Sequence, residues 1–218
     1  MNRWFAVSAC GEVPHGQVAQ SQLLGQELVL WRSAAGALNA WENRCPHRGV
    51  RLTLGACVAE ELRCQYHAWR FASGSGQCTH IPSHPHQKPA GTIRPQVFPV
   101  FEDGTFAWVN LTREAVSPQR PAAGIDTALR SIFARAPVAA VRQVLLRGYA
   151  DQSVGLVDEF TLDATEYALR FMLQPVTEGQ TIIHARLQGE VAAAKRMAVL
   201  RHHNALMSAA RDHAEAAS

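Results

Sequence analysis

Two pairs of cysteine and histidine are the residues of this sequence best suited to chemistry. One residue separates Cys45 from His47, two residues separate Cys64 from His67, and sixteen residues lie between the pairs. Thiolate sulfur and imidazole nitrogen both bind transition metals. Each pair falls at the end of a predicted β-hairpin, so the two hairpins can converge on one metal centre as two fingers. The pattern therefore predicts a site with two thiolate and two imidazole ligands.

The sequence around these pairs resembles the Rieske iron–sulfur family. The matching stretches are CPHRGV from Cys45, CQYHAWRF from Cys64, then Gly76-Gln77-Cys78 and Ile81-Pro82. The resemblance spans about residues 3–110, roughly the first half of the chain. It implies a Rieske-type all-β domain that carries a [2Fe–2S] cluster.

The same resemblance implies which of the four ligands binds which iron. Cys45 and Cys64 would hold one iron, and His47 and His67 the other. Because neutral imidazole replaces thiolate, such clusters have potentials of roughly −150 to +300 mV, against about −400 mV for plant-type ferredoxins. Structural zinc accepts the same ligand set and remains an alternative, although zinc modules usually pair C-x2-C with H-x3-5-H. A module in which the cluster senses redox state is a further alternative.

The neighbouring residues indicate a subclass. Rieske proteins of cytochrome bc complexes carry one more cysteine in each finger, where this chain has Val50 and Tyr66. No shielding disulfide is therefore expected, and the fingers are more similar to those of ring-hydroxylating oxygenases and O-demethylases. Ala68 stands where those enzymes usually have glycine. Arg48, Tyr66 and Trp69 border the ligands and could form either a docking face or local packing.

Composition narrows the remaining classes. The 218 residues are 47% hydrophobic and 18% charged, with a formal net charge of +3. Such a weak positive charge, scattered along the chain, argues against a nucleic-acid partner. No apolar run is long enough for a membrane-spanning helix, and no signal peptide is evident. We therefore expect a cytoplasmic protein, in which the three remaining cysteines are small core thiols: Cys10, Cys57 and Cys78.

The pattern along the chain predicts an α+β protein with two parts. We expect a Rieske domain over 1–111, a Pro-rich linker over 112–124 and a shortened α+β domain over 125–218. The first part has short predicted strands at 28–32, 37–43, 61–63, 68–72, 96–101 and 105–110. The second has a predicted helix at 126–136 that Pro137 stops, a strand hairpin over 166–188 and a final helix over 191–214.

The second part lacks the motif of an oxygenase iron site. Oxygenases similar to this chain hold a mononuclear iron with two histidines and a carboxylate. Residues 113–218 contain four histidines, none of them in the D/N-x2-H-x4-5-H pattern. His202 and His203 are adjacent, so on a helix they point about 100° apart, and we expect both, with Asp212, on the helix surface. The sequence thus predicts a catalytic domain without its iron.

Two functions follow from these observations. The first is an electron-transfer protein, or a non-catalytic subunit, that relays single electrons from a reductase or ferredoxin to a full-length oxygenase subunit. Its assembly is expected to be a homo- or hetero-oligomer, and no catalytic residue is assigned. The alternative is a compact oxygenase or demethylase acting on an aromatic or similar small molecule. Its best iron ligands are His184, His202 or His203, and Asp212.

Overall fold

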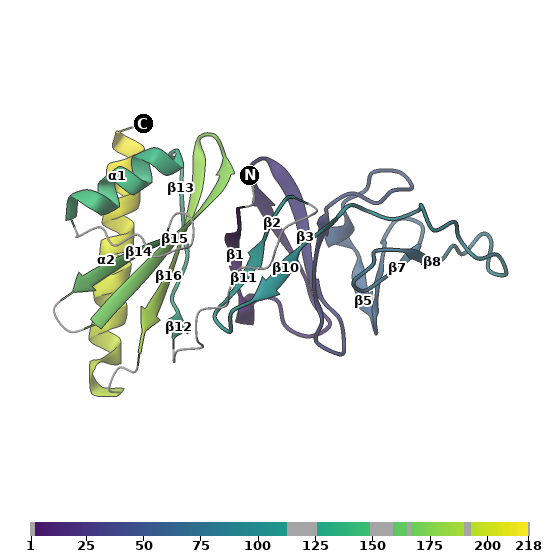
Figure 1. The fold of residues 1–218 in the computed structure, drawn as a ribbon, viewed down its shortest axis with the longest axis horizontal. Helices are drawn as coiled ribbons and strands as arrows, with labels where there is room; N and C mark the ends of the chain where they lie inside the picture. The colour runs from purple at the N-terminus through teal and green to yellow at the C-terminus, as the bar shows by residue number, and fades with distance from the viewer. Residues whose placement is uncertain (1–2, 113–125, 149–158, 165–166, 190–192, 218) are drawn as a thin grey trace.

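The computed structural model describes residues 3–112, 126–148, 159–164, 167–189 and 193–217. Figure 1 shows that the elements are stacked in layers along the long axis of the molecule. Two helices lie at one end, followed by a long-stranded sheet, then a pair of packed sheets, and finally a small sheet at the opposite end. No helix among the described residues is long and apolar enough to cross a membrane.

Two antiparallel sheets form a sandwich in the N-terminal part. The first has the strand order β1-β11-β10 and comprises Phe5–Ala9, Phe106–Val109 and Val100–Glu102. The second has the order β2-β3-β4-β9 and comprises Val18–Leu23, Gln26–Arg32, Leu38–Glu42 and Val97–Phe98. Their facing side chains, among them Phe5, Leu28, Leu30 and Val109, make one buried core.

A small four-stranded sheet packs against the outer face of this sandwich. It comprises β5 (Ala56–Val58), β6 (Glu61–Arg63), β7 (Arg70–Ala72) and β8 (Cys78–His80). Strand β3 explains why the contact forms: Leu28 and Leu30 face the sandwich core, whereas Val29 and Trp31 belong to the core under the small sheet. A strand buried on both faces carries a continuous apolar run instead of alternation. Single 3-10 turns occur at Cys10–Glu12 and Leu52–Leu54.

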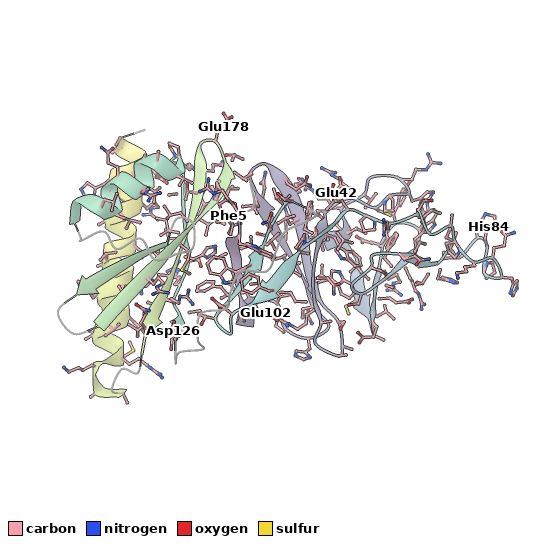
Figure 2. The ribbon with its side chains drawn as sticks, in the orientation of Figure 1. Phe5, Glu42, His84, Glu102, Asp126 and Glu178 are labelled. Atoms are coloured by element: carbon pink, nitrogen blue, oxygen red, sulfur yellow. The ribbon has the colours of Figure 1, made fainter. Side chains whose placement is uncertain are left out.

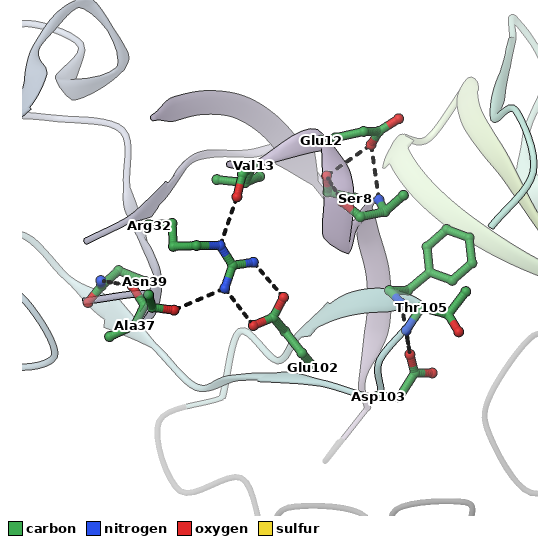
Figure 3. Close-up of polar contacts among 12 residues, drawn as sticks. Ser8, Glu12, Val13, Arg32, Ala37, Asn39, Glu102, Asp103 and Thr105 are labelled. Carbon is green, nitrogen blue, oxygen red and sulfur yellow. Dashed lines mark hydrogen bonds and ion pairs between the residues drawn. The ribbon is translucent and has the colours of Figure 1, made fainter. Parts of the chain in front are cut away.

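Arg32 connects the two sheets of the sandwich. Its guanidinium makes a two-point contact with Glu102 of β10, at 2.5 and 2.8 Å. The same side chain donates to the carbonyl oxygens of Val13 and Gly36 (Figure 3). Only 9% of the Arg32 side chain is exposed. The Arg32 bond keeps the pKa of Glu102 below its ordinary value, so the carboxylate is charged at neutral pH.

The C-terminal part is a sheet with both helices on one face. Its strands have the order β12-β16-β15-β14, and β13 also pairs with β16. The bounds are β12 Thr127–Ala128, β13 Ile132–Ala134, β14 Glu159–Ala164, β15 Tyr167–Thr177 and β16 Gln180–Gln188. Helices α1 (Val138–Gly148) and α2 (Ala193–Ala216) pack against the face that presents Ile183, Ala185 and Leu187. This architecture confirms the α+β class and the hairpin and final helix expected from the sequence.

The predicted helix over 126–136 is wrong. The segment forms strands β12 and β13, which pair with β16, for example Ile132 with Ile183. Ile132 and Ala134 are buried and Phe133 is exposed, a strand alternation that competes with the helical pattern. Pro137 does not stop a helix but begins one, because its carbonyl accepts from Ala140 and Val141 in the first turn of α1. The predicted linker, apart from Thr112, lies outside the described residues.

The second face of the long-stranded sheet packs on the N-terminal sandwich. Met172 of β15 shares a buried cluster with Trp4, Phe106 and Trp108. Beside it, Arg186 of β16 lies 2.9 Å from the Asp103 carboxylate in the β10–β11 turn, and 4% and 3% of these side chains are exposed. Gly104, the next residue in this turn, takes the left-handed backbone that glycine adopts without strain, with φ of 95°.

His184 lies at the centre of this contact and its protonation can be deduced from its neighbours. The Gln174 amide nitrogen donates to Ser21 Oγ and to the Gln22 carbonyl, so its oxygen is the atom facing His184 Nε2 at 2.8 Å. Nε2 must therefore carry the proton, and Nδ1 accepts from Ser131 Oγ at 2.8 Å. Burial lowers the pKa of His184 to about 4. The imidazole is neutral and serves as a hydrogen-bonded part of the core.

The buried His184 predicts a loss of stability in mild acid. Above pH 6.5 the imidazole is neutral in both folded and unfolded chains. As the pH falls toward 4, His184 binds a proton in the unfolded chain but stays neutral in the folded chain, where its pKa is about 4. We expect the free energy of unfolding to fall by up to about 3 kcal/mol more over this interval than in His184→Gln. Urea unfolding at several pH values measures this. The prediction would be contradicted if the free energy of unfolding changed equally with pH in the wild type and in His184→Gln.

Candidate metal site in two equivalent loops

The two Cys–His pairs lie in loops with the same backbone hydrogen bonds. In the first, which follows β4, the Cys45 amide donates to Val50 and the Cys45 carbonyl accepts from Gly49. In the second, between β6 and β7, the Cys64 amide donates to Trp69 and its carbonyl accepts from Ala68. The loops therefore fold alike although their histidines stand at different places, two and three residues after the cysteine. This equivalence brings the pairs together.

Both loops need a left-handed residue four positions after the cysteine. Gly49 has φ of 71° and Ala68 has φ of 55°. Glycine adopts this conformation freely, whereas a residue with a Cβ pays a steric cost. The alanine that departs from the family pattern therefore sits at a strained position.

We expect Ala68→Gly to stabilise the protein. Relief of the left-handed strain, about 1–2 kcal/mol, exceeds the entropy that glycine adds to the unfolded chain, about 0.4–1 kcal/mol. The free energy of unfolding should rise by roughly 0.5–1 kcal/mol. Gly49→Ala is the matched opposite, since a Cβ at Gly49 meets no atom within 4 Å and only the backbone cost remains. The urea concentration at the midpoint of unfolding should rise in Ala68→Gly and fall in Gly49→Ala. A shift in the same direction for both variants would show that the backbone at Ala68 is not strained.

The sulfur side of the site is buried. Cys45 and Cys64 belong to the core beneath the small sheet, with 3% and 2% exposure. Burial, together with the neighbouring Cys64 thiol, raises the pKa of Cys45 to about 12, while backbone N–H groups of His47 and Arg48 oppose the rise. Two adjacent buried thiols resist joint ionisation unless a cation lies beside them. Their placement suits a metal that water does not reach.

The nitrogen side of the site is at the surface. The Nδ1 atoms of His47 and His67 face each other at 3.0 Å, and their ring centroids are 4.7 Å apart. Two imidazole nitrogens on one tetrahedral metal, each bonded at about 2.1 Å, lie roughly 3.4 Å apart. His67 is exposed and His47 half-buried. Burial, the neighbouring His67 and Arg48 all lower the pKa of His47, which favours the neutral ring that a metal binds.

Aromatic side chains hold the two histidines in place. Trp69 stacks on His47 with centroids 4.3 Å apart and an interplanar angle of 7°. Tyr66 lies against His67 at 3.9 Å and leaves 60% of its surface exposed. Of the residues that border the candidate ligands, Trp69 thus orients a histidine and Tyr66 is exposed to solvent. Sequence reasoning missed Trp31 and Trp41, a buried edge-to-face pair that supports both cysteines from below.

The four candidate ligands form two pairs and not one cage. The described ranges contain no group of three or more His, Cys, Asp and Glu side chains that could hold a single metal ion. Tetrahedral zinc needs four donors around one ion. A two-iron cluster needs only two protein donors at each iron, which is what the buried thiols and the facing imidazoles provide. The donor set therefore fits the cluster better than zinc.

Three of the four alternative iron ligands are engaged elsewhere, and the fourth, His202, is exposed on α2 as expected. His184 bonds Ser131 and Gln174, and His203, expected on the helix surface, is buried with its Nε2 against the Arg130 carbonyl at 3.1 Å. Asp212 is exposed and pairs with the Arg211 next to it. Of the three predicted core thiols, Cys78 is buried, whereas Cys10 and Cys57 are half-buried. All five cysteines are free thiols.

Comparisons with known proteins agree with this geometry. Residues 3–99 match the family model of the Rieske [2Fe–2S] domain. The oxidoreductase NdmD of Pseudomonas putida is 36% identical over 86% of this chain and 33% of its own length. The oxygenase subunit of 3-chlorobenzoate-3,4-dioxygenase from Comamonas testosteroni is 37% identical over 49% of the chain and 24% of its own length. The chain thus spans a third or less of the length of these curated relatives.

Solved structures extend the likeness to both parts of the chain. Apo dicamba monooxygenase has a TM-score of 0.79 at 18% identity, covering 99% of this chain and 85% of that chain. At that identity the comparison shows a shared fold and nothing about activity. The loops with their buried thiols and facing imidazoles, together with the family match, lead to one conclusion. Residues 3–99 form a Rieske [2Fe–2S] domain, and the cofactor of this chain is a Rieske iron–sulfur cluster.

Proposed function

We propose that Cys45 and Cys64 hold one iron of the cluster, that His47 and His67 hold the other, and that the chain relays single electrons. The donor would be a cytoplasmic reductase or ferredoxin, and the acceptor the iron of a separate oxygenase subunit in a homo- or hetero-oligomer. The observation that carries the proposal is the asymmetry of the site, with thiols buried and imidazoles exposed. Electrons then enter and leave at the histidine side.

The side chains of the site support this role in three ways. The core around the cysteines excludes water, and N–H groups of His47 and Arg48 donate toward the Cys45 sulfur. Trp69 fixes the His47 ring, so the two Nδ1 atoms stay directed at one point. When bound, the [2Fe–2S] group accepts and releases one electron at a time. Because the sulfur atoms are buried and the imidazoles are held in place, the side chains of the site would move little when an electron arrives or leaves.

The C-terminal part supports a structural role in this proposal. One face of its sheet is covered by the helices and the other by the sandwich. The histidines that could serve as iron ligands are hydrogen-bonded within these contacts. We therefore propose that residues 125–218 form a domain without a mononuclear iron, which holds the cluster domain in an assembly.

The stoichiometry of metal and electrons tests the function. The purified chain should contain two irons and two acid-labile sulfides and take up one electron in an anaerobic titration followed by visible absorption. It should not turn over oxygen unless an oxygenase subunit is added. A third iron with oxygen-dependent oxidation of an aromatic substrate would replace the proposal with the compact oxygenase. Stoichiometric zinc in a colourless protein would reject both.

A further inference from the structure

Charge is unevenly distributed along the long axis of the molecule. Residues 44–94, which comprise both cluster loops and the small sheet, contain seven lysines and arginines and two glutamates, a net charge of +5. The whole chain has a net charge of only +3, so the remainder is net negative. Figure 1 places β5, β7 and β8 at the end opposite the helices, and Figure 2 places His84 at the extreme tip of that end. The end with the cluster loops is therefore the basic end.

Part of this charge is neutralised locally. Arg44 and Arg51 both pair with Glu27, at 3.0 and 2.5 Å, and Arg70 lies 3.6 Å from Glu61. Such exposed pairs add little stability but do cancel field. Four further basic side chains are exposed and have no carboxylate partner among the residues described: Arg48, Arg63, Lys88 and Arg94. We call these four the basic rim.

The basic rim is connected to the candidate ligands along the chain and through a shared core. Arg48 follows His47, and Arg63 precedes Cys64. Lys88 and Arg94 belong to the segment between β8 and β9, whose Ile81 and Ile93 pack into the same core as the two cysteines. The amide of Cys78 also donates to the Ile93 carbonyl at 2.9 Å, which fixes the base of that segment. The positive charges therefore lie at the same end of the molecule as the two imidazoles.

We propose that this end of the molecule docks a protein redox partner through an acidic face. The proposal rests on the proposed electron relay and names the chemistry of its partner: a protein whose own redox group lies under a patch of carboxylates. Unpaired basic groups attract such a patch from a distance and raise the rate of encounter. The exposed ring of Tyr66 supplies an apolar contact beside His67. A nucleic-acid duplex would use the charge, but its paired and stacked bases would not contact that ring.

Stopped-flow reduction of the holoprotein tests the inference. The probe is a plant-type [2Fe–2S] ferredoxin with an acidic surface, mixed in its reduced form at low ionic strength. We expect Arg63→Glu/Lys88→Glu to lower the second-order rate constant about tenfold or more, and the wild-type rate to fall with added salt. Arg196→Glu/Arg201→Glu makes the same charge change on exposed positions of α2 at the opposite end, and should change the rate less than twofold.

Two further measurements make the outcomes distinct. A small neutral reductant, photoreduced deazaflavin, should reduce the wild type and both variants equally. If it reduces none of them, the electron relay itself fails. Oxidation by cytochrome c, a basic protein, should be faster in Arg63→Glu/Lys88→Glu. If ferredoxin rates are insensitive to salt and equal in both double variants while deazaflavin works, the docking inference is overturned. The same follows if duplex DNA competes more strongly than an acidic protein.

Discussion

Replacing Cys64 by alanine should abolish the cluster and with it all electron uptake. Cys64 is one of only two buried thiols at the site, and no other cysteine or carboxylate among the described residues completes a group with it. With one thiolate left, an iron loses half of its protein ligands, and the affinity for the cluster collapses. The expected result is a colourless protein with iron below a tenth of the wild-type content, measured by metal analysis and visible absorption.

Cys78→Ala is the matched control for this variant. Cys78 is 1% exposed and belongs to the same core as Cys45 and Cys64, but its thiol lies 3.7 Å from the His80 carbonyl and not against a candidate ligand. Its replacement leaves a similar small cavity, with a loss of about 1 kcal/mol, and should leave iron and colour unchanged. Iron retained in Cys64→Ala, or lost equally in both variants, would refute the ligand assignment.

The convergence of the two Cys–His pairs was predictable because its signals are local. A cysteine and a histidine within one loop, repeated once, indicate the candidate ligands without knowledge of the fold. The β3–β4 hairpin was likewise readable, because its strands and the turn at 33–36 are contiguous. The sequence could not show that Trp69 stacks on His47 or that Ala68 takes the backbone of Gly49. Those features depend on how the second loop folds.

The C-terminal part was less predictable because its structure depends on distant partners. The segment 126–136 has apolar residues that satisfy a helix or a strand, and pairing with β16, about fifty residues later, decides for the strand. His203 looked like a surface residue until the Arg130 carbonyl, 73 residues away, provided a partner in the interior. The contact between Arg186 and Asp103 spans 83 residues and has no sequence signature.

Replacing Arg186 by methionine should cause a large loss of stability, because it removes the contact with Asp103. The Asp103 carboxylate accepts from the amides of Thr105 and Phe106 and from Trp108 Nε1, but Arg186 is the cation at hydrogen-bond distance from it. Methionine fills a similar volume and leaves the carboxylate buried without that charge. Removing one partner of a buried pair costs about 3–5 kcal/mol. In a chain of this size the melting temperature should fall by roughly 10 °C.

Arg211→Met is the control, because its pair with Asp212 is exposed and should contribute little to stability. Adding Asp103→Asn to Arg186→Met removes the orphaned charge, so the double variant should be more stable than the sum of the single losses by at least about 1 kcal/mol. Urea unfolding of the wild type, Arg186→Met, Asp103→Asn and the double variant measures this coupling. Strict additivity would mean that the two side chains do not act as a pair. Because Arg186 belongs to β16 and Asp103 to the β10–β11 turn, a large coupling also means that the sheet under the helices and the sandwich that carries the cluster loops stabilise each other.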